Sequence, residues 1–165
     1  MGGRGNGYAN TRKGKREDIP IAKQLRSSWE ANFARALMVL QEAGCVAWWD
    51  YEPWPLKFPG NEEKVRGNKV YWPDFIAVFP IAYEDIGIPA GLYLFEVKGR
   101  LKNGGLLTET DLSDLDKASD SASRIKLQRL MRHYPELASK TILIGQREYA
   151  DFKKQFKAAI PNWES

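Results

Sequence analysis

The chain has 165 residues, of which 43% are hydrophobic, and a formal net charge of +4. This length supports one domain with its own core and is short for two. With one cysteine (Cys45) and one histidine (His133), the chain can form neither an internal disulfide nor a Cys/His zinc site. Any metal would then be held by carboxylates, which favour hard ions such as Mg²⁺ or Mn²⁺. Because a long apolar run and a signal-peptide core are both missing, we expect a soluble cytoplasmic protein without a membrane segment.

Basic residues are concentrated at the N-terminus. Residues 1–26 contain seven Lys/Arg and two acids, a net charge of +5, whereas the remaining residues sum to −1. A glycine-rich basic arm is typical of segments that contact the phosphate backbone of nucleic acids, and also of solubilising tails. Residues 27–165 are then expected to form the folded domain. The candidate phosphate-binding residues of the arm are Arg12, Lys13, Lys15, Arg16 and Arg26.

The first expected elements follow the arm. Apolar residues recur at helical spacing from Trp29 to Leu40, behind a capping serine, and predict a helix that ends near Gly44. The aromatic segment 46–58 contains two prolines and suits an edge strand. After a polar turn, the segment 70–79 predicts a strand that pairs with the first in a hairpin with a long loop.

The second half of the chain predicts a further strand and then alternating helix and strand. GLYLFEVKG is typical of a short, buried central strand, and a polar, glycine-containing loop at 99–118 follows it. A helix should begin at Ser119 or Ser121 and end before Pro135. A strand at 141–145 and a helix at 148–159 complete an α/β fold. We therefore predict a single mixed β-sheet flanked by helices, in the order α-β-β-β-α-β.

A carboxylate and an ammonium group lie two residues apart in the otherwise apolar segment from Leu92 to Gly99. Because side chains alternate along a strand, Glu96 and Lys98 are expected on one face. Ionised groups in a buried strand are destabilising unless they are paired or bind a metal. The pattern predicts either a plain ion pair at the strand end or part of a catalytic site.

Another acid begins the preceding strand, directly after a proline. Asp74 can be a turn-forming residue, which is common after proline. Two carboxylates from neighbouring strands with a lysine beside them can also bind a divalent cation and the phosphate that it polarises. Pro73-Asp74 followed by Glu96-Val97-Lys98 resembles the signature of the PD-(D/E)xK nuclease superfamily.

The resemblance extends to the helix before these strands, which begins SSWEANFAR. Members of the superfamily often place another acid there, and Glu30 is the matching residue, although a serine three residues earlier also makes it part of a capping box. The resemblance implies that Glu30, Asp74 and Glu96 hold one or two Mg²⁺ ions, for which Mn²⁺ can substitute, with the Val97 carbonyl as a further ligand. It also implies that Lys98 orients or deprotonates the attacking water.

SSWEANFAR, YEPWPLKF, YWPDF and FEVKG together resemble small phage-encoded nucleases, including Holliday junction resolvase-like enzymes, over residues 26–100. The connection between the second and third strands is longer than in compact archaeal junction-resolving enzymes, because PIAYEDIGIPA is inserted. In the following helix, relatives often direct a Gln, Lys or Arg toward the site. Arg124, Lys126 and Gln128 are candidates, with Lys126 and Gln128 favoured, although a basic solvated helix face would have the same sequence.

The resemblance implies a Mg²⁺-dependent DNA endonuclease that leaves a 5′ phosphate and a 3′ hydroxyl. Small size, a basic arm and no recognisable helix-turn-helix predict a homodimer that recognises branched DNA by its shape. The alternatives are a sequence-specific restriction-type or transposon-end endonuclease, and an inactive nuclease-fold DNA-binding module. RNase H-like resolvases also use carboxylates and Mg²⁺, but they would not require Lys98.

Overall fold

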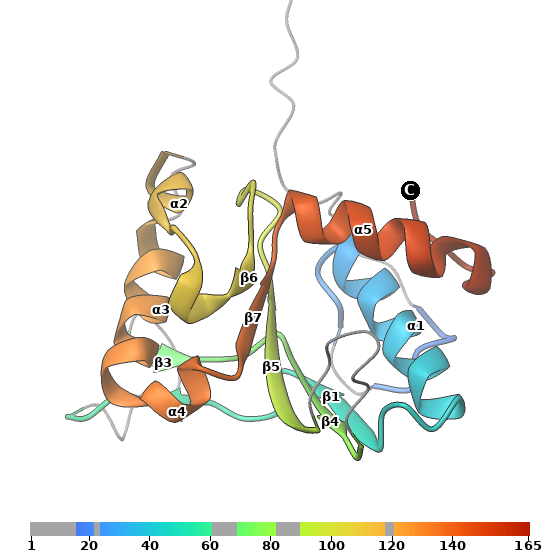
Figure 1. Ribbon diagram of the computed structural model, residues 1–165, viewed down its shortest axis with the longest axis horizontal. Coiled ribbons are helices and arrows are strands. Elements are labelled where there is room, and N and C mark those ends of the chain that lie inside the picture. Colours follow the sequence, from blue (N-terminus) through green and yellow to red (C-terminus); the bar gives the residue numbers. More distant parts are fainter. Residues whose placement is uncertain (1–15, 22–23, 61–68, 82–89, 118–120) are drawn as a thin grey trace, which may run out of the picture.

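The computed structural model describes residues 16–21, 24–60, 69–81, 90–117 and 121–165. Its central element is a five-stranded mixed β-sheet with strand order β1-β4-β5-β7-β6 (Figure 1). The strands of this sheet are β1 (Trp48–Tyr51), β4 (Phe75–Phe79), β5 (Gly91–Val97), β6 (Gly105–Leu106) and β7 (Thr141–Ile144). The α/β prediction is therefore confirmed, with β1 at an edge and β5 in the centre as expected.

Helices cover both faces of the sheet, α1 and α5 on one side and α2, α3 and α4 on the other (Figure 1). The first helix begins where predicted because the Ser27 hydroxyl accepts the N–H of Glu30, and it ends before Gly44, whose φ of 78° suits glycine. The helices are α1 (Ser28–Glu42), α2 (Ser113–Lys117), α3 (Ser121–His133), α4 (Pro135–Ala138) and α5 (Gln146–Phe156), with 3-10 turns at Leu107–Glu109 and Lys157–Ala159.

The predicted hairpin forms, but each of its strands is divided in two. β1 pairs antiparallel with β4 in the main sheet. Beyond the prolines, β2 (Leu56–Lys57) and β3 (Val70–Tyr71) pair in a separate two-stranded sheet. The expectation of a single sheet is thus wrong. The physical reason is that proline cannot donate to a ladder, so Pro53, Pro55 and Pro73 interrupt the pairing.

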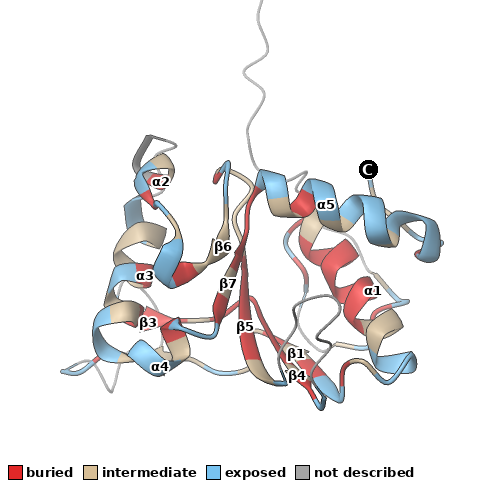
Figure 2. Cartoon of the chain, viewed as in Figure 1, coloured by how far each residue is buried: buried red, intermediate tan, exposed pale blue. Residues whose placement is uncertain are grey.

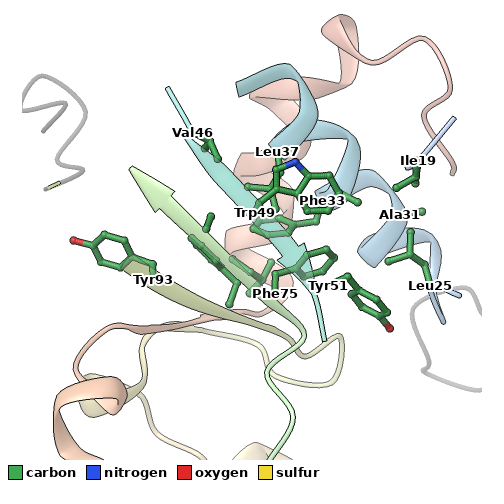
Figure 3. Close-up of a cluster of buried hydrophobic side chains, with 14 of the residues drawn as sticks. Ile19, Leu25, Ala31, Phe33, Leu37, Val46, Trp49, Tyr51, Phe75 and Tyr93 are labelled. Carbon is green, nitrogen blue, oxygen red and sulfur yellow. The ribbon is translucent and has the colours of Figure 1, made fainter. Parts of the chain in front are cut away.

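Two hydrophobic cores lie on opposite faces of the main sheet. One contains Phe33 and Leu37 of α1 with Phe75 of β4 (Figure 3). Phe95 of β5 belongs to the same core. The other packs α3 against β7 and the two-stranded sheet, and it includes Tyr71. Figure 2 shows that the buried residues concentrate in the central strands and in the part of α1 next to the sheet. Side-chain alternation therefore assigns Phe95 to the α1 face and Glu96 to the α3 face.

The segment expected as a polar loop at 99–118 contains β6, a 3-10 turn and α2. This difference arises because its leucines are buried in the core next to α3, although their spacing matches neither a helix nor a strand. The leucines concerned are Leu101, Leu107, Leu112 and Leu115.

Residues 16–21 and 24–26 of the expected arm lie against the domain. Ile19 and Leu25 are buried in the α1-side core, and Arg16 forms an ion pair with Glu164 near the C-terminus. The packed domain therefore begins before residue 27, and the expected arm is shorter than residues 1–26. Among the helices of the described ranges, none is both long and apolar enough to cross a membrane.

Candidate active site

Two buried carboxylates meet where β4 begins and β5 ends. The antiparallel register pairs Phe75 with Phe95, and its continuation places Asp74 opposite Glu96. Oδ2 of Asp74 accepts the backbone N–H of Val97 at 2.7 Å, and the N–H of Asp74 approaches Oε2 of Glu96 at 3.4 Å. The side chains are fixed from both strands, and the two residues are only 6% and 5% exposed.

Glu96 is held by two further groups. The hydroxyl of Tyr71 donates to Oε2 at 2.8 Å, and Nζ of Lys98 lies 2.9 Å from Oε1. Glu96 and Lys98 are thus neighbours, as strand alternation predicted. The structure also contains the plain ion pair that was the alternative interpretation, but with a second buried carboxylate, Asp74, beside it.

Burial and the proximity of two carboxylates determine the electrostatics of this cluster. Burial, and then the charge of Glu96, raise the pKa of Asp74 well above its ordinary value, while Lys98 and the N–H of Val97 act in the opposite direction. Burial and the adjacent Glu96 likewise raise the pKa of Tyr71, which therefore remains a hydrogen-bond donor. Lys98 pairs with Glu96, and the exposed guanidinium of Arg26 lies 3.8 Å from Asp74. A divalent cation can bind between the acids and compensate their charge further.

The cluster opens into a pocket of about 690 Å³. The pocket is lined by two acids of the predicted site, by basic residues and by polar and aromatic side chains of β3 and α3. Its lining residues are Gln24, Arg26, Glu52, Tyr71, Trp72, Asp74, Glu96, Lys98, Ser123, Lys126 and Leu127.

The helix α3 contributes one of the two favoured candidates. Lys126 lines the pocket, whereas Gln128 is exposed and does not. Two residues correspond to about 200° of rotation around a helix, so the two side chains point in nearly opposite directions. Arg124 is half-buried and is not among the lining residues. The expectation that Gln128 faces the site is therefore wrong.

Glu30 lies near Asp74 without joining the pair of acids, and its charge contributes, after burial and Glu96, to the raised pKa of Asp74. It is buried, but it does not line the pocket. Its Oε2 accepts the backbone N–H of Arg26 at 2.7 Å and the hydroxyl of Tyr51 at 3.1 Å. The reason is its position, because α1 packs on the sheet face opposite Glu96. Within the described ranges, no group of three or more His, Cys, Asp or Glu side chains is arranged to hold a metal. The three-carboxylate convergence expected from the sequence is not present in this geometry.

The predicted DNA-binding residues of the N-terminal arm fall into three groups. Arg26 lines the pocket, with its side chain 59% exposed. Arg16 instead donates to Glu164 and to the carbonyl of Leu25, and its side chain is 8% exposed, so its role is structural. Arg12, Lys13 and Lys15 lie outside the described residues.

Tyr71 is the functional candidate that sequence reasoning missed. In the sequence it is one of many aromatic residues expected to fill a core, and its contact with Glu96 spans 25 positions. The signal that was available is its position three residues before Asp74 in the predicted strand segment 70–79, which places it near the same end of that segment.

Buried acids, a lysine and further basic side chains at one pocket define a chemical class of site that can bind a cation together with an anionic substrate. Comparison with protein-family models, with curated proteins and with solved structures gives no match to the chain. What the site can do therefore follows from its own geometry and chemistry.

Proposed function

We propose that the chain is a Mg²⁺-dependent DNA endonuclease with a restriction endonuclease-like core of the PD-(D/E)xK superfamily. The observation that carries this proposal is the pairing of Asp74 with Glu96, beside Lys98, in one pocket. A structural ion pair needs one acid and one base, whereas this pocket holds a second buried carboxylate, which lies 3.8 Å from the exposed guanidinium of Arg26. A divalent ion between the two acids would compensate their charge more fully. The order of α1, β1, β4, β5, α3 and β7 supports the proposed core.

The acids present fit a hard divalent ion. Mg²⁺ in phosphate-transfer sites is commonly bound by one or two carboxylates, with water and substrate oxygens completing its coordination. Asp74 and Glu96 would hold the ion, with the Val97 carbonyl as a third protein ligand. The raised pKa of Asp74 supports the fit, because its cause is uncompensated negative charge as well as burial. When bound, the ion supplies charge neutralisation at the phosphate and activation of water.

Lys98 has the position required of a residue that acts on the attacking water. Its ammonium group is 2.9 Å from Glu96 and only 17% exposed, so it is held beside the acids rather than in bulk solvent. As an ammonium group it can orient the water and stabilise negative charge on the phosphorane, and in its neutral amine form it can take up the proton of the water. Lys126, also in the pocket, can bind a neighbouring phosphate.

The proposed substrate is branched DNA, and the proposed active form is a homodimer. We further propose a phage or bacterial origin and a location in the cytoplasm of the bacterial cell or host. One small pocket accounts for one strand cut, and paired cuts most simply require two chains. The basic residues at the pocket are suited to binding backbone phosphates. The positions of these phosphates depend on the shape of the DNA and not directly on its base sequence.

The proposal is tested by substituting each member of the cluster. We expect Asp74→Asn, Glu96→Gln and Lys98→Ala each to lower Mg²⁺-dependent cleavage by several orders of magnitude, while DNA binding remains near wild type. Asp151→Asn and Lys154→Ala are matched controls, because these residues form an exposed ion pair 3.5 Å apart on α5. Cleavage should be measured with Mg²⁺ and with Mn²⁺. Full cleavage by Lys98→Ala would refute its role, and a wild-type protein that binds DNA without cutting it would be an inactive module.

A further inference from the structure

Glu30 is the shared acceptor in a small hydrogen-bond network at the start of α1. Its Oε2 accepts the N–H of Arg26 and the hydroxyl of Tyr51. The ring of Tyr51 packs against Phe75, with centroids 5.1 Å apart, and Figure 3 shows its hydroxyl directed out of the hydrophobic cluster. Glu30 therefore fixes the backbone of Arg26 directly and the phenol of Tyr51 at the same time.

Tyr51 in turn holds the side chain of Arg26. Nε of Arg26 donates to the Tyr51 hydroxyl at 3.2 Å. At the other end of the guanidinium, Nη2 pairs with Glu52 and lies 3.8 Å from Oδ1 of Asp74. The guanidinium of Arg26 thus contacts Tyr51, the partner of the buried Glu30, on one side and faces the acids of the pocket on the other.

We propose, on the basis of the function proposed above, that Arg26 binds the phosphate group next to Asp74 and that Glu30 positions Arg26 instead of binding the metal. A guanidinium presents paired N–H donors that match phosphate oxygens, and fixing it in advance reduces the entropy lost on binding. The carboxylate of Glu30 accepts two hydrogen bonds, one from the backbone N–H of Arg26 and one from Tyr51, whose hydroxyl accepts from Nε of Arg26, and these bonds provide that fixation.

The location of the network supports this assignment over metal binding. Glu30 is 7% exposed and absent from the pocket wall, and two donors bind its Oε2, so its carboxylate is held outside the pocket that contains Asp74. Arg26 needs no such change, because its side chain is 59% exposed and already near Asp74. In the absence of DNA, the acids Glu52 and Asp74 neutralise the guanidinium that a phosphate would take over.

The experiment separates metal binding from phosphate binding. Mn²⁺ affinity is measured on the metal-free protein by paramagnetic resonance or calorimetry, without DNA, for Asp74→Asn, Glu30→Gln, Tyr51→Phe and Arg26→Gln. We expect Asp74→Asn to lose Mn²⁺ binding and Glu30→Gln and Tyr51→Phe to keep it within about twofold, because no metal ligand is removed. A loss of about tenfold or more in Glu30→Gln would overturn the inference, because removing even a residue that only orients a metal ligand lowers metal affinity by about that much.

DNA affinity is measured for the same variants in a Lys98→Ala background, which prevents cleavage. Arg26→Gln should weaken DNA binding about 10- to 100-fold and reduce the salt dependence by about one phosphate contact. Tyr51→Phe should weaken it about 3- to 10-fold by removing one neutral hydrogen bond. Tyr93→Phe, which alters another buried tyrosine, is the control.

Coupling between the substitutions provides the decisive comparison. If Tyr51 acts only by positioning Arg26, then Tyr51→Phe should have no further effect on DNA affinity in the Arg26→Gln background. Additive effects of the two substitutions on DNA affinity would refute the positioning role. Because this comparison uses Tyr51→Phe, it can be made even if Glu30→Gln fails to fold. Wild-type protein that binds no Mn²⁺, or Asp74→Asn protein that binds it normally, would instead refute the proposed nuclease function.

Discussion

Tyr71 donates a 2.8 Å hydrogen bond to Glu96 from a strand that belongs to a different sheet. The phenol is fully buried among residues of the α3-side core, so its position is set by packing and not by solvent. The bond occupies Oε2 and leaves Oε1 facing Lys98. The small β2-β3 sheet thus has a defined contribution to the site, which is to fix the orientation of one acid.

Tyr71→Phe should therefore reduce metal affinity and cleavage while preserving the fold. Removing a partner that orients a metal ligand typically lowers affinity or activity about 10- to 100-fold. Mn²⁺ titration and cleavage rates provide the measurement. Tyr93→Phe is the matched control, because the Tyr93 hydroxyl is buried on the opposite sheet face and has no hydrogen-bond partner among the described residues. Equal effects of the two substitutions would show that the Tyr71 hydroxyl has no special role.

Asp74→Asn should stabilise the metal-free protein at neutral pH. Folding raises the pKa of Asp74, so the folded state binds the proton more tightly and its stability falls as pH rises from the ordinary aspartate range to the raised value. Asparagine removes this buried charge and can keep the bond to the N–H of Val97. We expect a rise in melting temperature of about 3–8 °C at pH 8, decreasing toward pH 4.

Thermal unfolding with and without Mg²⁺ checks this prediction. The ion should raise the melting temperature of the wild type and leave that of Asp74→Asn unchanged, because binding to the folded state alone is stabilising. A variant that is less stable than the wild type at pH 8 would instead identify Asp74 as a structural carboxylate.

The local parts of the site could be predicted from the sequence. The capping pattern before Glu30 places the start of α1 correctly, because a cap depends on residues three apart. Strand alternation places Glu96 beside Lys98 for the same reason. The proline before Asp74 marks the start of β4, since proline interrupts pairing there.

The remainder depends on contacts between distant parts of the chain. Nothing local in the sequence distinguishes Glu30 as a metal ligand from Glu30 as the partner of Tyr51, which lies across the sheet edge. Likewise, Arg16 lies in a segment whose basic, glycine-rich composition is typical of an arm, but its partner Glu164 is 148 positions away. Such pairings are set by tertiary packing, which overrides local pattern.

Glu164→Gln should destabilise the fold by about 1–3 kcal/mol, since Glu164 accepts charged hydrogen bonds. Both Arg16 and Arg35 donate to it, and their side chains are each 8% exposed. The bond from Arg16 is the main cause of its lowered pKa, so the stabilisation exists at neutral pH and is lost as pH falls through that lowered value. Denaturant unfolding at pH 7 should show the loss, and at strongly acid pH the variant and wild type should converge. Asp151→Asn, at an exposed position, is the control.

Deleting residues 1–15 should weaken DNA binding without changing stability. The basic residues removed would neutralise phosphates and release counterions, so the slope of affinity against salt should become shallower. Deleting residues 1–18 should also lower stability, because Arg16 and Asp18 form ion pairs with Glu164 and Arg35. Salt-dependent binding and unfolding of the two truncations give the comparison, and an identical salt slope in the shorter one would make the arm a solubilising tail.

The outer edge of β1 is the surface we predict to join two chains. Among the described residues no strand pairs with this edge, and Trp48 on it is 44% exposed, with Trp54 nearby in sequence 40% exposed. An edge strand with exposed aromatic residues is a favourable site for association. Trp49, in contrast, is buried in the core, so it is not substituted in the test of this surface.

If the proposed dimer forms through this edge, Trp48→Arg should convert it to a monomer and reduce paired cutting of four-way junctions more than single nicking. The arginine places a charge on an apolar interface, whereas the pocket that contains Asp74 and Glu96 is formed within one chain. Light scattering gives the mass, and cleavage of matched junction, flap and linear DNA in Mg²⁺ gives the preference. A wild-type monomer that cuts linear duplex at one sequence and ignores junctions would favour a restriction-type enzyme, because shape recognition by backbone contacts would then be insufficient to explain its specificity.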